Sequence, residues 1–424
     1  MRSRRPFLFR SLVSIIDQVL LSGLNFMIGI ALIRYASKET YGLYSQLFGV
    51  GLLITTLLEA MIGSALTTLS ARLTSIDRST FLARAARIQW AASAIYAVIA
   101  GLGVGILVKT LDLSEDPLLL ALSFGAFIFT LGSREYCRTA LFIDLRPDLA
   151  TKMDFIFVLT TVFGAALIFL AGHVSLTQVI SLLAASNGVA AMFYSGTLIR
   201  GIGPSANWQQ YIDDISSLWA LSQWALAGSV LGWIGNNSYL YFVGGLVGIA
   251  ALADLNAARL LLMPIVIVGM AWSRVARPTM GQLIASSDWL KLRHFATRSI
   301  LAIEGITAAY VLTLIVSFPW LSSHVLHGKY ENILTLLLLW GCYFGANAAR
   351  NVGTMLLTSF GAFRALFWQG LVSVLFLFMA WAWWIPQFGV IGGISAMIVV
   401  ELGELLANHL YLIPRAKVKL LALE

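Results

Sequence analysis

The chain contains, near its start, two long apolar runs joined by a short polar turn. Residues 12–33 read LVSIIDQVLLSGLNFMIGIALI, residues 34–42 read RYASKETYG, and residues 43–65 read LYSQLFGVGLLITTLLEAMIGSA. A helix rises about 1.5 Å per residue, so each run is long enough to cross a hydrocarbon layer about 30 Å thick. The segment therefore predicts a helical hairpin that crosses a membrane twice.

The same pattern continues along the whole sequence. The apolar runs cover residues 12–33, 43–65, 88–108, 118–138, 153–172, 177–199, 217–243, 248–273, 298–320, 332–358, 366–384 and 390–412. Hydrophobic residues make up 59% of the chain and charged residues 11%, which is far from the average soluble protein. We predict an all-α polytopic membrane protein with about 12 transmembrane helices.

Lys and Arg residues gather in every second gap between the runs. The two terminal segments and gaps two, four, six, eight and ten hold nearly all of them, whereas the other gaps hold only Arg34, Lys38, Lys109 and Lys329. Cytoplasmic loops carry such an excess, so we expect both termini in the cytoplasm. The net charge of +8 then reflects loops that face anionic membrane lipid, and no nucleic-acid partner is expected.

A polar break near the middle of the chain divides the runs six and six. Residues 201–217 are rich in Gly, Asn, Gln and Asp, which is typical of a linker. We predict a six-helix lobe over residues 1–200, a cytoplasmic linker over 201–217 and a second six-helix lobe over 218–424. Halves of equal orientation form a parallel repeat, an arrangement that transporters use to build a central lumen.

The sequence gives no sign of an enzyme. It contains no Walker loop, no Gly-x-Ser-x-Gly motif and no His-Glu-x-x-His motif. The gaps on the outer side are too short to fold around a core of their own. Cys137 and Cys342 are too few and too distant for a metal site or a disulfide framework. We therefore expect no enzymatic activity, no metal and no cofactor.

Polar side chains inside the apolar runs are candidates for function, because a charged group that faces lipid is costly. Guanidinium groups suit an anionic cargo, since they stay charged and offer paired donors to phosphate oxygens. The candidates for a substrate lumen are Arg34, Arg259, Arg350, Asn25 and Asn347. Alternatively, Arg259 and Arg350 bridge to acids on neighbouring helices or extend to the membrane interface, Arg34 is a solvated helix cap, and Asn25 joins two helices.

Five acidic residues are candidates for binding a coupling ion. They are Glu401, Glu404, Asp17, Glu59 and Glu304. Glu401 lies near the middle of the run 390–412, and Glu404 shares its helix face. Alternatively, Glu401 is protonated and bonds to another helix, and the shallower acids pair with arginines of the cytoplasmic side. Pro264, inside the run 248–273, is expected to kink its helix.

The first hairpin resembles the start of the bacterial O-antigen and exopolysaccharide flippases of the multidrug/oligosaccharidyl-lipid/polysaccharide (MOP) exporter superfamily. The segments that carry the resemblance are Asp17-Gln18, Ser22-Gly23-Leu24-Asn25-Phe26, Ile33-Arg34-Tyr35 and Tyr41-Gly42-Leu43-Tyr44-Ser45. The resemblance implies a MATE-like fold of two six-helix lobes around a lumen, in the bacterial inner membrane. It also implies an oligosaccharide cargo on polyprenyl pyrophosphate, moved from the cytoplasmic to the periplasmic leaflet, with polysaccharide polymerase and chain-length proteins as partners.

Three other functions stay open. A cation-coupled multidrug exporter of the same superfamily would share the fold and favour acids over arginines in its lumen. A membrane polysaccharide polymerase or ligase usually carries a large outer loop, which the short outer gaps disfavour. A scaffold subunit for such enzymes would tolerate replacement of each intramembrane charge.

Overall fold

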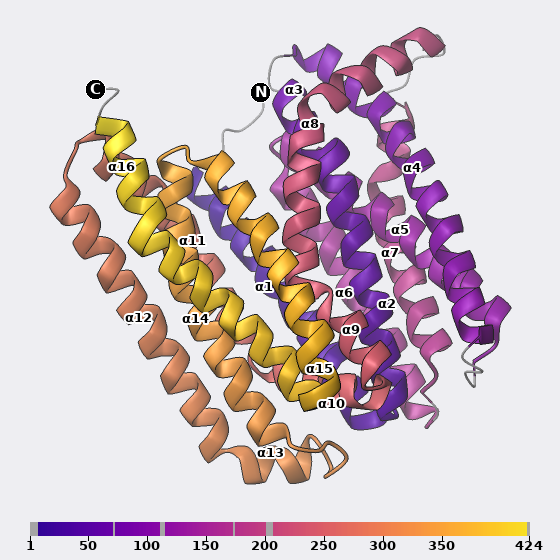
Figure 1. The fold of residues 1–424 in the computed structure, drawn as a ribbon. Helices are drawn as coiled ribbons and strands as arrows, with labels where there is room; N and C mark the ends of the chain where they lie inside the picture. The colour runs from indigo at the N-terminus through magenta and orange to yellow at the C-terminus, as the bar shows by residue number, and fades with distance from the viewer. Residues whose placement is uncertain (1–6, 71–72, 111–114, 173, 201–206, 422–424) are drawn as a thin grey trace. The chain divides into compact units, whose positions relative to one another are not determined.

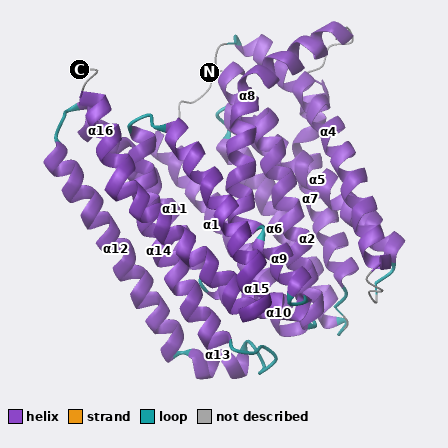
Figure 2. Ribbon diagram, viewed as in Figure 1, coloured by secondary structure: helices purple, strands orange, loops and turns teal. Residues whose placement is uncertain are grey.

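The computed structural model describes residues 7–70, 73–110, 115–172, 174–200 and 207–421. Short turns join long helices in this part of the chain, and no strand occurs in it (Figure 2). The predicted all-helical class is confirmed. The chain divides into two compact units, Met1–Trp233 and Ile234–Glu424.

The first unit consists of long helices with one irregular turn (Figure 1). In chain order they are α1 (Phe7–Tyr35), α2 (Lys38–Leu58), α3 (Ser64–Ser70), α4 (Ser75–Thr110), α5 (Pro117–Ile143), α6 (Pro147–Leu170), α7 (Leu176–Arg200) and α8 (Trp208–Asn237). A π-helical turn, η1 (Glu59–Gly63), connects α2 to α3 without a break. The division between the units falls inside α8.

Local sequence explains where these helices begin. Ser37 caps α2 by accepting a bond from the backbone N–H of Thr40 at 3.0 Å. Asp116 caps α5 in the same way through Leu119 at 2.7 Å, and Pro117 occupies the first helical position. A short polar side chain followed by proline satisfies the first free N–H groups and fixes the helical φ angle.

Small residues bring α4 and α5 into close contact. A Cβ atom on Gly101 would lie 2.8 Å from the carbonyl oxygen of Ala121, and one on Gly125 would lie 3.0 Å from that of Ala97. Residues four apart lie on one face of a helix, so Ala97 and Gly101 form a smooth strip that meets Ala121 and Gly125. Membrane helices pack through such strips, because lipid gives them little hydrophobic drive to associate.

Helix α8 begins within the segment predicted as a linker. Residues 201–206 of that segment lie outside the described residues, whereas 208–217 form the first turns of α8. Two contacts hold this end to α4: Arg84 binds Asp214 at 2.6 Å and 3.1 Å, and Arg87 donates to the hydroxyl of Tyr211 at 3.0 Å. Polar residues that suggest a loop in the sequence thus join two helices.

The second unit begins with two short helices and continues with long ones. In chain order they are α9 (Tyr239–Leu246), α10 (Ile249–Leu261), α11 (Met263–Ala285), α12 (Trp289–Val316), α13 (Phe318–His324), α14 (Ile333–Ser359), α15 (Phe363–Ala407), the π-helical turn η2 (Asn408–Leu412) and α16 (Ile413–Leu421). Helices α10 and α11 meet at an angle of 48°. Pro264 lies in the first turn of α11, so the predicted kink is confirmed.

Helix α15 contains two predicted runs on either side of a sharp bend. The backbone of Gly389 has φ 56° and ψ −136°, a conformation open to glycine and strained for other residues. The indole of Trp381 is fully buried and donates to the carbonyl of Gly393 at 2.9 Å. This bond crosses the bend and ties its two arms together.

By length and composition, nine helices of the described residues could cross a membrane, or ten if the bent pair α10 and α11 forms one span. The number is lower than the twelve predicted runs partly because α15 counts once. In addition α8, which contains most of the run 217–243, is not in this set. Ser, Gln and Asn residues interrupt it.

Candidate functional site

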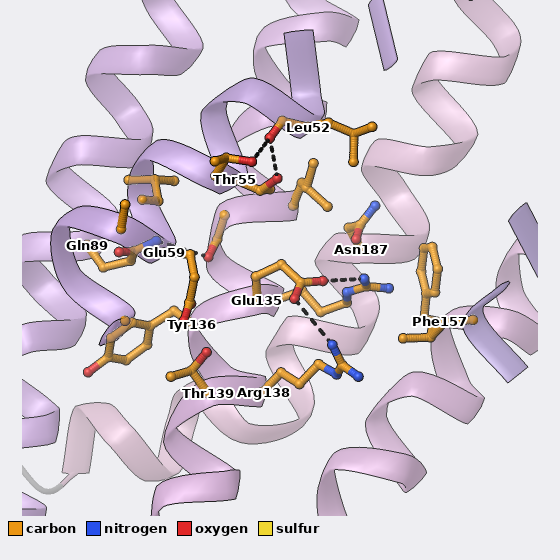
Figure 3. Close-up of a pocket in the computed structure, with 18 of the residues that line it drawn as sticks. Leu52, Thr55, Glu59, Gln89, Glu135, Tyr136, Arg138, Thr139, Phe157 and Asn187 are labelled. Carbon is orange, nitrogen blue, oxygen red and sulfur yellow. Dashed lines mark hydrogen bonds and ion pairs between the residues drawn. The ribbon is translucent and has the colours of Figure 1, made fainter. Parts of the chain in front are cut away.

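A cavity of about 670 Å³ lies inside the first unit (Figure 3). Its walls come from α1, α2, η1, α3 and α4 to α8. Its polar and charged lining residues are Gln18, Ser22, Asn25, Thr55, Thr56, Glu59, Ser64, Gln89, Arg134, Glu135, Tyr136, Arg138, Thr139, Asn187 and Ser229. Helices of membrane-spanning length therefore surround a space lined by ionisable groups.

Arg138 of α5 is the centre of an ionic cluster beside this cavity. Its Nη2 lies 2.7 Å from Oδ2 of Asp17 on α1, and its Nε lies 3.0 Å from Oδ2 of Asp154 on α6. Its Nη1 lies 3.7 Å from Oε2 of Glu135, one of the contacts drawn as dashed lines in Figure 3. Asp17 and Asp154 are fully buried. One guanidinium thus links three helices.

Arg134 lies one turn earlier on α5 and is almost completely buried. Its Nη2 contacts Oε1 of Glu135 at 2.6 Å, and its Nη1 lies 4.0 Å from Oδ1 of Asp154. Its guanidinium covers the ring of Phe157 at 4.0 Å from the ring centroid. Nε and Nη1 donate no hydrogen bond within the described residues. The ring contact is a cation–π interaction, which suits a partly desolvated guanidinium.

Acidic groups outnumber basic ones in this region. Two guanidinium groups face Asp17, Glu135 and Asp154, and Glu59 lines the same cavity from the π-helical turn η1. Glu59 is exposed to the cavity and forms no ion pair within the described part of the chain. Its carboxylate rests against Gly63, where a Cβ atom would collide with it. Single π-helical turns inside α-helices often occur at functional sites.

The sequence pointed to part of this region. Asn25 and Glu59 line the cavity. Asp17 is not among the lining residues, but it forms an ion pair with Arg138, which is one of them. Arg134 and Arg138, at the end of the run 118–138, were predicted to belong with the basic cytoplasmic gap that follows it, and Glu135 and Asp154 were not among the predicted site residues. The sequence does contain a signal for this pair: Arg134 and Arg138 are four residues apart, which places them on one face of a helix. The helix α5 begins with a long apolar run and continues past both arginines to Ile143.

In the second unit the structure brings four candidate residues together. Nε and Nη2 of Arg350 contact Oε2 and Oε1 of Glu401 at 2.8 Å and 3.2 Å, and Nε lies 3.3 Å from Oε2 of Glu404. The amide of Asn347 donates to Oε1 of Glu401 at 3.0 Å. The pairing joins α14 to α15 and leaves Arg350 with an excess of acid around it.

Arg259 has different surroundings. Its Nη1 donates to the hydroxyl of Tyr239 at 3.1 Å, and its guanidinium lies 5.6 Å from the ring centroids of both Tyr239 and Trp340. The Tyr239 hydroxyl in turn donates to Asn256 at 2.7 Å. No acid forms an ion pair with Arg259 within the described residues, and its Nε lacks a hydrogen-bond acceptor there. Aromatic faces partly compensate this charge.

Two further candidates stand apart from these clusters. Glu304 lies in the middle of α12, where its carboxylate contacts the face of α14 at Gly345. Arg34 is exposed near the end of α1, with its guanidinium 5.4 Å from the ring centroid of Tyr35. The described residues contain no group of three His, Cys, Asp or Glu side chains that could hold a metal ion.

Comparisons with known proteins identify the fold. The chain is similar to a multidrug resistance MATE transporter of the MOP superfamily in an inward-facing conformation, with a TM-score of 0.63, 14% identity and coverage of 96% of this chain and 95% of that one. It is also similar to the lipid II flippase MurJ in an inward closed conformation, with a TM-score of 0.69, 12% identity and coverage of 98% and 92%. A third similar structure is a MOP superfamily transporter from Pyrococcus furiosus. Its TM-score is 0.62 at 12% identity, and the match covers 97% of this chain and 95% of that one.

No protein-family model and no curated protein matches the sequence. At identities of 12% to 14%, the structural likeness establishes the fold, which this chain shares with MOP superfamily transporters. The described neighbours are transporters and flippases rather than enzymes.

Proposed function

We propose that the chain is a flippase for lipid-linked oligosaccharides in the bacterial inner membrane. It would move a sugar chain on polyprenyl pyrophosphate from the cytoplasmic to the periplasmic leaflet, where polymerase and chain-length proteins would use it for surface polysaccharide. Both termini would lie in the cytoplasm. The observation that supports this proposal is the charged cavity of about 670 Å³ within helices of membrane-spanning length, in a fold shared with a lipid flippase.

The guanidinium groups of the cavity suit the anionic part of this cargo. Arg134 and Arg138 line the cavity on successive turns of α5, and each can offer paired N–H donors to phosphate oxygens. Nε and Nη1 of Arg134 are buried and have no hydrogen-bond acceptor within the described residues, so the guanidinium would have to turn toward the cavity to offer them to a phosphate oxygen. No bond of the cargo is made or broken, so transport requires binding and release alone.

The surrounding carboxylates suggest how binding is coupled to an ion. A pyrophosphate can contact Arg138 only when the ion pairs of Arg138 with its carboxylate partners are weakened. A coupling cation bound by Asp17, which is buried against Arg138 at 2.7 Å, would compete with the guanidinium for this carboxylate and free it for the cargo. Cargo binding should therefore strengthen when the coupling ion is present. Glu59, which forms no ion pair in the described chain, is a second carboxylate able to bind the ion, while Glu401, Glu404 and Glu304 are candidates in the second unit.

Arg259 and Arg350 differ in what they can offer to an anion. Arg350 is held by Glu401 and Glu404, so it serves the cargo only after one of these acids is neutralised. Arg259 has aromatic and hydroxyl partners and no acid in an ion pair in the described chain. We therefore rank Arg259 above Arg350 as a cargo contact, with Asn25, Asn347 and Arg34 as further polar contacts.

The excess of acids favours a second candidate function, a cation-coupled multidrug exporter. The cavity cluster contains Asp17, Glu59, Glu135 and Asp154 against two arginines, which suits a cationic cargo if all four acids stay ionised. The fold allows this function as well, because MATE transporters share it.

A transport assay separates the two functions. The protein is reconstituted into vesicles with a fluorescent short-chain polyprenyl-pyrophosphate disaccharide, and the lipid that reaches the outer leaflet is measured by quenching. We expect transport by the unchanged protein, at least about tenfold slower transport with Arg138→Gln because a charge-assisted contact is lost, and normal transport with the control Lys291→Gln. Lys291 is an exposed cation outside the cavity.

The same vesicles test the alternative with a cationic dye such as ethidium. Dye transport without movement of the lipid would assign the chain to the exporters. Because Arg138→Gln could lower stability, Asp17→Asn provides a second variant that retains the arginine. It should weaken the dependence of lipid transport on an imposed ion gradient, and an unchanged dependence would remove Asp17 from the coupling step.

A further inference from the structure

A second, apolar pocket of about 240 Å³ lies in the first unit between α1, α6 and α7. Its walls include Leu24 and Ile28 on α1, Ala165 and Phe169 on α6, and Leu182 on α7. Thr161 supplies the one hydroxyl group among its lining residues. That hydroxyl donates to the backbone carbonyl of Phe157 at 2.7 Å, so the pocket offers hydrocarbon surface alone.

The apolar pocket continues the polar cavity along the same helices. Leu183 of α7 lines both spaces. On each of three helices about one turn separates a residue of the cavity from one of the pocket: Asn25 and Ile28 on α1, Phe157 and Thr161 on α6, and Asn187 and Leu183 on α7. A charged chamber that passes into an apolar one within a single turn is suited to an amphiphilic molecule.

The pocket has a buried floor and an exposed edge. Leu24 and Leu32 are 3% and 0% exposed, whereas Met27 and Val162 at the edge are 60% and 43% exposed. Exposed apolar residues on a membrane-spanning helix face lipid. A hydrocarbon chain can therefore enter the pocket from the bilayer past Met27 and Val162.

We propose that this pocket holds the first isoprenoid units of the cargo's polyprenyl carrier while its pyrophosphate lies beside Arg134 and Arg138. The assignment rests on the proposed function and names the part of the cargo that the first unit holds. Lipid tails are as apolar as leucine, so the pocket gains little from the hydrophobic effect. Its contribution is positional, because a fixed first segment of the tail places the phosphate oxygens at the guanidinium groups.

The direction of α1 sets the order of the two spaces across the membrane. α1 passes from the cavity at Gln18 to the pocket at Leu32, about one turn before the helix ends at Tyr35. With the N-terminus in the cytoplasm, as proposed, the cavity would lie near the middle of the span and the pocket in its outer half, so the headgroup would lie on the cytoplasmic side of the tail segment.

Photolabelling in membranes tests the pocket without any transport step. The probe is polyprenyl phosphate with a diazirine on its first isoprenoid units, and the labelled peptides are mapped by mass spectrometry. We expect label on segments 24–32 and 161–169, and competition by unlabelled polyprenyl phosphate but not by phosphatidylglycerol. Ala165→Phe, which fills the pocket, should lower labelling about tenfold. The matched control Ala94→Phe, on an exposed face of α4 away from both spaces, should leave it unchanged.

The outcomes are distinct. Equal competition by phosphatidylglycerol, or unchanged labelling in Ala165→Phe, would show ordinary surrounding lipid and overturn the assignment. Because Ala165→Phe could fold poorly, Val162→Phe at the exposed edge gives a milder block, and the competition experiment needs no variant. Specific labelling of a protein that fails to move the lipid would support the pocket while refuting the flippase function. Normal transport without specific labelling would support the flippase function and refute the pocket assignment.

Discussion

Arg350 binds Glu401 with two of its nitrogens: Nε lies 2.8 Å from Oε2 and Nη2 lies 3.2 Å from Oε1. From the sequence, Arg350 is a candidate contact for an anionic cargo and Glu401 a candidate for a coupling ion. In the structure the two residues form one ion pair, so a change of charge on Glu401 alters what Arg350 can bind. Glu404 adds a second acid at 3.3 Å from the same guanidinium.

This ion pair predicts that the effects of Arg350 and Glu401 variants on the free energy of unfolding are strongly non-additive. Arg350→Ala leaves Glu401 and Glu404 together without a cation, so we expect it to lower the free energy of unfolding by about 3 kcal/mol. The double variant Arg350→Ala with Glu401→Gln should recover about 1 to 2 kcal/mol of that loss. Thermal unfolding of the purified protein in detergent measures both. If the changes in unfolding free energy of the two single variants simply added up in the double variant, the contact between Arg350 and Glu401 would contribute nothing to stability.

A second prediction concerns the start of α7. The carboxylate of Glu115 accepts bonds from the backbone N–H of Leu176 at 2.8 Å and from the hydroxyl of Thr177 at 2.6 Å. Glu115 therefore caps a helix from another loop, and Glu115→Ala should cost about 1 to 2 kcal/mol of stability. Hydrogen exchange should show faster exchange of the Leu176 amide. The neighbouring Asp116, which caps α5, provides the control, since Asp116→Ala should speed exchange at Leu119 and leave Leu176 protected.

A third prediction concerns the attachment of α8 to α4. Arg84 and Asp214 form a largely buried, two-point ion pair, with side-chain exposures of 16% and 12%. Asp214→Asn should lower the stability of the first unit by about 2 kcal/mol, because a charge-assisted hydrogen bond is weakened. The exchanged pair Arg84→Asp with Asp214→Arg should restore part of the loss. Failure of the exchange to improve on either single variant would argue against a direct pairing.

A fourth prediction separates the position of Glu59 from the stability of its helix. A methyl group at Gly63 would collide with the Glu59 carboxylate, which can swing away because it ends a flexible side chain. Gly63→Ala should therefore leave unfolding within about 1 kcal/mol of the original, since alanine also favours helix. If Glu59 takes part in coupling, the dependence of transport on the ion gradient should change in this variant, as we also expect for Glu59→Gln. A matching Gly103→Ala, at an open position on α4, should have no effect.

The helical class could be predicted because hydropathy alone determines which segments enter a bilayer. Helix boundaries were harder to place. α12 begins at Trp289 rather than near residue 298, and α8 begins at Trp208, because Asp288 caps one helix and Arg84 and Arg87 hold the other. Caps and cross-helix bonds of polar residues extend a helix beyond its apolar run.

The candidate site was predictable only in part, since the sequence marks which charges lie inside helices and not which ones meet. Asp17, Asp154 and Arg138 belong to three helices, and nothing in their spacing shows that they form one cluster. The cluster depends on how α1, α5 and α6 pack together. Residues near the ends of apolar runs, such as Arg138 and Asp154, were therefore the easiest to misjudge.

The π-helical turn at Glu59–Gly63 inserts one residue into an otherwise regular helix. Each residue of an α-helix turns the next side chain by about 100°, so α3 is rotated out of phase with α2. Deleting a single residue inside this turn would keep the helix continuous and restore its phase, but would swing every side chain of one segment toward new neighbours. The turn thus fixes the angular register between Glu59 and the side chains of α3, and insertions or deletions there should be far more harmful than in the loops.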